Sequence, residues 1–315
     1  MERETAQRLY EAMLLTRLLE ERLVTLLRQG HLPGTIYRSL GQEATACATA
    51  MALGPEDVIG PLLRNLGSML VRGATPEEVL LQYLRRATGP TGGREGNLHF
   101  GSVARGILAP TAALGAMIPV MAGVALSFRQ RGENRVAMTW IGDGGSSTGA
   151  FYEGLNFAVV QKLALIVVGE ANGYAFSTPP DRQMAGSMAA RSQGAFTLVV
   201  DGNDAIAVFE AAAQARQRCL DGDGPVFLVC ETFRMKGHAE HDDQRYVEPA
   251  LLAEWAAKDP LPRFEGWLAR QGWPPDPTLE GRMRQALSEA AEQALLAPWP
   301  DPASLERGVF SGPTP

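Results

Sequence analysis

The chain has 315 residues, of which 20% are charged, and its formal net charge is −6 with an isoelectric point near 5.4. This composition is typical of a globular protein that is large enough to bury a core. An acidic chain without a basic stripe argues against a nucleic-acid partner, and the lack of an uninterrupted apolar run of about eighteen residues argues against a membrane span.

The N-terminus and the cysteines predict a cytoplasmic protein. The opening stretch MERETAQRLYEAMLL is charged and has a helical pattern, unlike a secretory signal peptide. Cys47, Cys219 and Cys230 are odd in number and lack metal-ligand spacing, which favours buried, reduced thiols.

The first part of the chain is predicted to be helical. An amphipathic helix is predicted over residues 4–29, where apolar residues recur mostly at steps of three and four, namely Leu9, Met13, Leu19, Leu23, Leu26 and Leu27. Glycine and proline in GHLPG (residues 30–34) end this pattern. An alanine-rich helix follows over residues 42–53. A third helix begins after Thr75, where TPEE provides an N-cap, a proline at the first helical position and acidic first-turn residues.

The middle of the chain alternates between predicted strands and helices. Strands are predicted over residues 135–142, 163–169, 195–202 and 224–233, and helices over residues 149–162 and 204–220. Apolar, β-branched strands separated by such helices predict an α/β fold with a doubly wound, mainly parallel sheet that is covered on both faces.

After Tyr246 the sequence changes to helical segments that are broken by prolines. We therefore expect an α/β domain over residues 1–250, which includes the N-terminal helix, and a C-terminal helical extension over residues 251–315.

Polar residues follow the first of these strands. In open parallel sheets, ligands bind beyond the carboxyl ends of the strands. The strand continues into IGDGGSSTG (residues 141–149), where glycines let the backbone approach an anion and a helix N-terminus favours it. Asp143 would repel a bare anion, but Mg²⁺ between them removes the conflict, because Mg²⁺ binds one or two protein oxygens together with phosphate oxygens.

Asn172 follows the second strand, in the stretch LALIVVGEANGYAFSTPP (residues 163–180). Asn-Gly alone is a common turn dipeptide. However, Asn172 comes 29 residues after Asp143 (172 − 143), which is about the length of one strand–helix–strand crossover. Two neighbouring parallel strands would place both side chains at the same edge of the sheet, so the pair is a candidate Mg²⁺ site.

These residues resemble the motif of thiamine-diphosphate-dependent enzymes, which is Gly-Asp-Gly followed further along by Asn-Asn. More narrowly, the chain resembles the alpha subunit of the heterotetrameric 2-oxo acid dehydrogenases of the pyruvate, branched-chain and acetoin types. The resemblance runs in register from about Leu9 to Tyr246. It is carried by YRSLGQEATA (37–46), RRATGPTGGREGNLHF (85–100), LGAMIPVMAGVA (114–125), YEGLNFAVVQKLALIVV (152–168), VDGND (200–204) and FRMKGHAEHDDQRYV (233–247).

The resemblance implies a site for thiamine diphosphate and Mg²⁺. Side-chain oxygens of Asp143 and Asn172 and the main-chain carbonyl of Tyr174 would bind the metal. Main-chain groups of Gly142, Gly144 and Gly145 would face the diphosphate. Arg64 would clamp the diphosphate with its forked guanidinium, and Leu114 would support the bent cofactor, with an ordinary core position as the alternative.

His238 corresponds to a loop histidine that contacts the cofactor phosphate region and the reacting 2-oxo acid or lipoyl group, so it is the candidate catalytic residue. His241 has no matching role and is expected to be solvated, whereas His99 is expected to be structural. For Glu170, loop hydrogen bonding and cofactor contact both remain open.

Three positions depart from the family pattern. Ala171 replaces the first asparagine of the usual pair, and Leu63 replaces the tyrosine that commonly precedes the clamping arginine. We expect these two changes to weaken cofactor binding mildly. Ala239 replaces the serine of the kinase-regulated relatives, which excludes phosphorylation at that position.

The resemblance implies the decarboxylating, lipoyl-acylating first component of a 2-oxo acid dehydrogenase complex, most simply of the pyruvate type. Its partners would be a beta subunit in an α₂β₂ heterotetramer, a lipoyl acyltransferase core and a small 2-oxo acid. The glutamate that activates the cofactor comes from the beta subunit in this family, so the chain is expected to be inactive alone.

Three alternatives stay open at this point. The GHAEHDDQRY loop (residues 237–246) favours an acetoin dehydrogenase alpha subunit, and Leu63 and Ala171 favour a non-catalytic, partner-binding subunit with a degenerate cofactor site. The third alternative is a nicotinamide-binding domain, for which GDGGSSTG does not supply the required Gly-x-Gly-x-x-Gly context.

Overall fold

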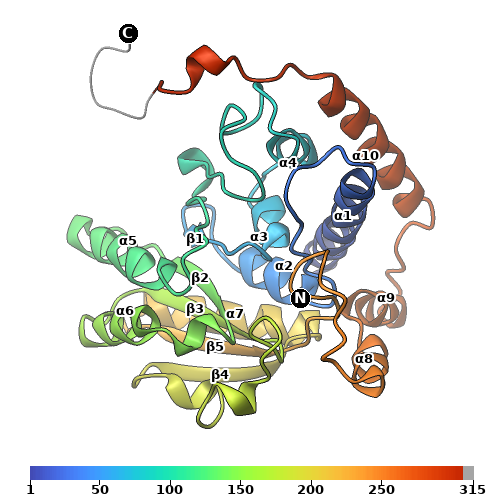
Figure 1. Ribbon diagram of the computed structural model, residues 1–315. Helices are drawn as coiled ribbons and strands as arrows, with labels where there is room; N and C mark the ends of the chain where they lie inside the picture. The colour runs from blue at the N-terminus through green and yellow to red at the C-terminus, as the bar shows by residue number, and fades with distance from the viewer. Residues whose placement is uncertain (308–315) are drawn as a thin grey trace.

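The computed structural model describes residues 1–307 and is built around a parallel sheet of five strands (Figure 1). The strands lie in the order β1-β2-β3-β5-β4, and all pairs are parallel. Their bounds are β1 Val58–Gly60, β2 Ala137–Gly142, β3 Leu165–Ala171, β4 Phe196–Asp201 and β5 Val226–Glu231. The predicted sheet is confirmed, and the unpredicted strand β1 has only three residues.

Successive strand residues point to opposite faces of the sheet, and each face has its own hydrophobic core. On β2, Met138 and Trp140 belong to one core, whereas Ala137 and Ile141 belong to the other. The first core is shared with α7 (Ala205–Leu220), and the second with α5 (Met117–Arg131) and α6 (Gly149–Val160). Figure 1 shows α5 and α6 side by side on one side of the sheet. The doubly wound fold is therefore confirmed.

Helix α5 contains Pro119 and Gly123, residues that disfavour a helix interior, and the sequence pattern did not predict it. Pro119 is tolerated because it lies in the first turn, where a main-chain N–H has no helical partner. The helix ends at Gly132, whose φ of 68° is left-handed, as is common at helix C-termini.

The predicted N-terminal helices are present. They are α1 (Arg3–Arg28), α2 (Glu43–Met51) and α4 (Pro76–Tyr83), with an additional short helix, α3 (Leu66–Val71). Thr75 and Glu78 form a reciprocal capping box at the start of α4. Arg17 on α1 bonds to Glu43 on α2 and to Asp259, which caps α9 (Pro260–Arg270).

The C-terminal part contains α8 (Pro249–Ala256), α9 and α10 (Leu279–Leu296), and α10 packs on α1 and α4. After α10 the chain crosses back over the α4 side of the molecule (Figure 1). There the guanidinium of Arg86 lies 4.0 Å from the ring centroid of Trp299, and Ala87 N donates to the carbonyl of Pro298.

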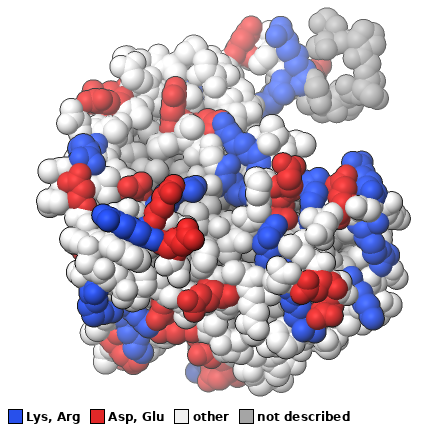
Figure 2. Space-filling view, turned by 180° about the vertical axis from the view of Figure 1, so that it is seen from behind, with Lys and Arg blue, Asp and Glu red and all other residues white. Residues whose placement is uncertain are grey.

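Cys47, Cys219 and Cys230 are free and buried, as predicted. Within residues 1–307, none of the helices combines the length and the apolar character needed to cross a bilayer. Figure 2 shows acidic and basic side chains interspersed over the face seen from behind, with uncharged areas between them.

Candidate functional site

The ends of β2 and β3 bring Asp143 and Asn172 into direct contact. These strands are neighbours, and Gly142 is paired with Glu170 in their register. Asp143 Oδ2 accepts hydrogen bonds from the main-chain N–H of Asn172 at 2.8 Å and of Gly173 at 3.1 Å. The prediction that one crossover places both residues at the same edge of the sheet is therefore confirmed.

The segment between Asp143 and α6 differs from the expectation. A 3-10 turn over Gly145–Ser147 precedes the helix, and Thr148 caps α6 by accepting from Phe151 N. The helix thus begins six residues after Asp143 (149 − 143). Asp143 therefore lies on a glycine-rich turn and not in the first turn of α6.

Three oxygen atoms converge beside Asp143. The amide nitrogen of Asn172 donates to Gln42 Oε1 at 3.0 Å. In this orientation the amide oxygen faces two further acceptors, Asp143 Oδ2 at 3.0 Å and the carbonyl oxygen of Tyr174 at 3.2 Å. Reversing the amide would place its nitrogen against these two oxygens instead. A cation would satisfy all three oxygens and keep the bond to Gln42.

This oxygen set suits a hard cation. Carboxylate, amide and main-chain carbonyl oxygens are the protein ligands that Mg²⁺ accepts, usually together with water and phosphate. Within residues 1–307, no group of three or more His, Cys, Asp and Glu side chains is arranged to hold a metal ion. A metal here would therefore depend on the amide and the carbonyl as well as on the single carboxylate.

A cavity of about 350 Å³ opens beside these oxygens. Its lining includes every predicted site residue, namely Arg64, Leu114, Gly142, Asp143, Gly144, Gly145, Asn172, Tyr174 and His238. The fold therefore brings together residues from five separate stretches of the sequence. Their individual roles remain predictions.

There is little room for a side chain at Gly144 and Gly145. A Cβ on Gly145 would lie 2.3 Å from Cδ1 of Ile141, and a Cβ on Gly144 would lie 3.0 Å from Cβ of Ala175. A side chain at Gly145 would therefore require the Ile141 side chain to shift.

Arg64 and His238 contact each other directly. The Arg64 guanidinium donates to the carbonyl of Arg38 at 2.8 Å and to the carbonyl of His238, and it lies 3.2 Å from His238 Nδ1. Because an arginine can only donate, Nδ1 is the acceptor and the proton of the neutral imidazole sits on Nε2.

The electrostatic surroundings keep His238 neutral. Burial, together with the positive charges of Arg64 and Arg234, lowers the pKa of His238 to about 4. The ring also packs against Tyr37 and Phe176, with centroid distances of 5.3 and 4.5 Å. At neutral pH His238 is therefore an uncharged hydrogen-bond donor at Nε2.

The loop that carries His238 is held by Asp242. The carboxylate of Asp242 accepts from the main-chain N–H of His238 at 2.6 Å, from Gln244 N at 2.9 Å and from the Tyr246 hydroxyl at 2.6 Å. Arg234 in turn donates to Tyr246 and to the carbonyl of Phe176. These bonds fix the loop without helix or strand.

Two arginines line the inner wall of the cavity, together with the carboxyl groups of Asp143 and Glu170. Arg64 and Arg234 both line it, and their hydrogen bonds go to carbonyl oxygens, the His238 ring and a tyrosine hydroxyl. Among the described residues, neither guanidinium forms an ion pair within 4 Å. Two arginines without a carboxylate partner favour an anionic ligand.

Glu170, left open by the sequence, is a buried residue near the end of β3. Its Oε1 accepts from Asn65 Nδ2 at 2.9 Å. Burial raises the pKa of Glu170 to about 7, and the Asn65 bond opposes this rise. Because Glu170 also lines the cavity, it makes the loop contact and faces the site as well.

Leu114 is not a core residue of this chain, which corrects one of its two predicted alternatives. Its side chain is 61% exposed, although it borders the cavity. His241 is exposed, as predicted, and His99 lies 3.3 Å from Glu95. Tyr37, Phe176 and Arg234 also line the site, and the sequence did not single them out; Tyr37 and Arg234 fall within stretches that carry the family resemblance.

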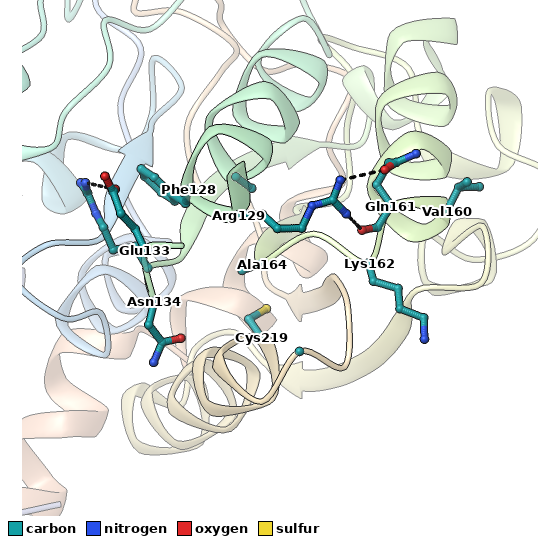
Figure 3. Close-up of a pocket in the computed structure, with 12 residues that line it drawn as sticks. Phe128, Arg129, Glu133, Asn134, Val160, Gln161, Lys162, Ala164 and Cys219 are labelled. Carbon is teal, nitrogen blue, oxygen red and sulfur yellow. Dashed lines mark hydrogen bonds and ion pairs between the residues drawn. The ribbon is translucent and has the colours of Figure 1, made fainter. Parts of the chain in front are cut away.

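A second hollow lies at the opposite edge of the sheet. It has a volume of about 510 Å³ and is lined by the C-terminal ends of α5, α6 and α7. Figure 3 shows Arg129 reaching across it to Gln161, whereas Lys162 extends away. Basic side chains at helix C-termini offset the helix dipole, so this lining has a structural explanation.

Comparison with known proteins agrees with the geometry. Residues 10–303 match the family model described as "Dehydrogenase E1 component". The pyruvate dehydrogenase E1 component subunit alpha of Staphylococcus aureus (strain COL) is 39% identical over 269 residues, which cover 84% of this chain and 70% of the relative. The protein of that name from Bacillus subtilis (strain 168) is 37% identical over 293 residues, which cover 91% and 76%. The predicted resemblance is confirmed, and the chain belongs to the dehydrogenase E1 component family.

Proposed function

We propose that the chain is the alpha subunit of a pyruvate-type E1 component that binds thiamine diphosphate and Mg²⁺. The observation that carries this proposal is the convergence of the Asp143 carboxylate, the Asn172 side-chain amide and the Tyr174 carbonyl oxygen beside two arginines that lack carboxylate partners. A metal diphosphate combines the cation that the oxygens suit with the anion that the arginines suit.

Each side chain would have a defined task toward the cofactor. Asp143, Asn172 and the Tyr174 carbonyl would hold Mg²⁺, and Arg64 would bind the diphosphate. Gly142, Gly144 and Gly145 leave room for close main-chain approach. When bound, thiamine diphosphate supplies the electron sink that decarboxylation of a 2-oxo acid needs.

His238 would act as a neutral donor toward the substrate or the lipoyl group. Its Nε2 carries the proton because Nδ1 accepts from Arg64. Leu114 would support the bent cofactor from the rim of the cavity.

Calorimetry of the full chain with its beta subunit tests the cofactor assignment. We expect thiamine diphosphate to bind only with Mg²⁺ present and the Arg64→Ala variant to bind it much more weakly. Equal binding with and without Mg²⁺ would contradict the metal assignment. The same titration of the Leu63→Tyr variant tests whether Leu63 weakens cofactor binding. An unchanged affinity would show that Leu63 does not weaken it.

A beta subunit would complete the site in an α₂β₂ heterotetramer. The chain has no counterpart of the glutamate that activates the cofactor in the family. Large apolar side chains are also exposed at the rim of the cavity and on α5 and α6, namely Leu114, Phe176, Val120, Phe157 and Val160. Robust decarboxylase activity of the isolated chain would contradict this assembly.

The substrate and the remaining partners belong to the same proposal. The relatives named above are pyruvate dehydrogenase subunits, so pyruvate is proposed as the substrate, a lipoyl acyltransferase as the acceptor and the cytoplasm as the location. The acetoin alternative is not favoured by these relatives. Activity assays with pyruvate, branched 2-oxo acids and acetoin decide among these substrates. If the assembled enzyme did not bind the cofactor, that result would favour the non-catalytic alternative.

A further inference from the structure

The stretch over residues 36–42, which we call the wall segment, contains neither helix nor strand, and its Tyr37 lines the cavity. The Tyr37 ring packs on His238, the Arg38 carbonyl accepts from Arg64, and Gln42 Oε1 accepts from Asn172. A shift of this segment would therefore displace the groups that face the diphosphate and the metal.

One buried carboxylate holds the centre of the wall segment. Both oxygens of Glu20, on α1, lie 2.9 Å from the main-chain nitrogen of Ser39, and Oε1 also accepts from the Ser39 hydroxyl at 2.6 Å. Glu20 is 3% exposed and Ser39 is fully buried. The anchor therefore lies inside the protein, directly behind the residues that face the cavity.

Packing alone does not explain a glutamate at this position. Its neighbours on the buried face of α1 are leucines such as Leu19 and Leu23, and a carboxylate in an apolar core is costly unless it is hydrogen-bonded. Burial indeed raises the pKa of Glu20 to about 7, against the opposing effect of the Ser39 bonds. The bonds to Ser39 are what this side chain supplies and a leucine would not.

We propose that Glu20 is a positioning residue for cofactor binding: by fixing Ser39 it sets the Arg38 carbonyl and Tyr37, and through them Arg64 and His238. Glu20 does not line the cavity, so its hydrogen bonds would act on the site through the wall segment, whereas its negative charge also acts on Arg64 directly and opposes the lowering of the Arg64 pKa by burial. The inference rests on the proposed thiamine diphosphate site.

The Glu20→Gln variant tests the proposal in the full chain with its beta subunit. The amide keeps the size of the side chain and one oxygen for the Ser39 hydroxyl and N–H. It replaces the second oxygen, which also accepts from the Ser39 N–H, by an NH₂ group that cannot accept, and it removes the negative charge. We expect faster hydrogen exchange of residues 36–42 and about ten-fold weaker binding of thiamine diphosphate with Mg²⁺. The Ser39→Ala variant, which loses only the hydroxyl donor, is expected to change both readouts in the same direction and by less.

Asp57→Asn is the matched control. Asp57 is also a buried carboxylate, 1% exposed, and it lies just before β1, at the amino ends of the strands and thus opposite the site. It accepts from the main-chain N–H groups of Gly54 and Val136 and pairs with Arg216. We expect this variant to lose stability but to keep the cofactor affinity. Equal weakening in both variants, or unchanged affinity and exchange in Glu20→Gln and Ser39→Ala, would overturn the proposal.

The two readouts separate the inference from the function on which it rests. If the unmodified complex does not bind thiamine diphosphate, the proposed function fails. The exchange of residues 36–42 in Glu20→Gln still decides whether Glu20 orders the wall segment.

Discussion

Asp143 has two tasks that substitutions can separate. Its Oδ2 accepts two main-chain hydrogen bonds, from Asn172 and Gly173, and the same carboxylate is the proposed Mg²⁺ ligand. Asp143→Ala leaves two N–H groups without their acceptor. Because an unsatisfied buried polar group costs about 1–3 kcal/mol, we expect the loss of the acceptor for two such groups to lower the free energy of unfolding by about 2–6 kcal/mol.

Asp143→Asn keeps an oxygen in place for both N–H groups. Burial raises the pKa of Asp143, so the charged form is disfavoured in the folded protein, and removing it should change stability by less than about 1 kcal/mol. Binding of Mg²⁺ with thiamine diphosphate should nevertheless be lost in both variants. Urea unfolding measures the first effect and calorimetry the second.

Two results would refute this reasoning. If Asp143→Ala is as stable as Asp143→Asn, the main-chain hydrogen bonds do not contribute as stated. If Asp143→Asn retains the cofactor affinity of the unmodified protein, Asp143 is not a metal ligand.

Three further predictions concern Leu114, Thr75 and His238. Leu114→Ala should change stability by less than about 0.5 kcal/mol, because the side chain is mostly exposed, but it should weaken cofactor binding; a large stability loss in urea unfolding would show a core role. Thr75→Ala should lower the free energy of unfolding by about 1 kcal/mol because it removes the capping box of α4, whereas Thr75→Ser should leave it unchanged. Thermal unfolding measures both effects. The folded-state pKa of His238 is about 4, below the usual 6.5. Between these two pH values the unfolded chain binds a proton at His238 that the folded chain does not, so the free energy of unfolding should rise with pH over this range. His238→Gln should flatten that rise, and an unchanged pH dependence of urea unfolding would contradict it.

The sequence predicted that Asp143 and Asn172 meet because strand ends are local features. Asp143 and Asn172 each follow an apolar run, and one crossover between them is enough to make their strands neighbours. Helix α5 was not predicted, because Pro119 and Gly123 disfavour a helix locally. Burial of Met117, Ile118 and Met121 against the sheet stabilises it.

The remaining site residues depend on tertiary structure. Tyr37 and Phe176 belong to irregular segments, and their contacts with His238 arise only when three distant loops meet. No periodicity marks such residues. The exposure of Leu114 was equally invisible, because an apolar residue in a sequence does not show whether its own chain covers it.

If a beta subunit covers the exposed Leu114, the position of this residue would link the proposed cofactor binding to subunit assembly. A beta subunit that covers this leucine and tightens cofactor binding by some factor must itself be bound more tightly, by the same factor, once the cofactor is present. Loading and assembly would then form one equilibrium, in which the supply of thiamine diphosphate sets how much of the alpha subunit is assembled. On dilution, an alpha–beta complex without thiamine diphosphate would accordingly dissociate before the loaded complex does.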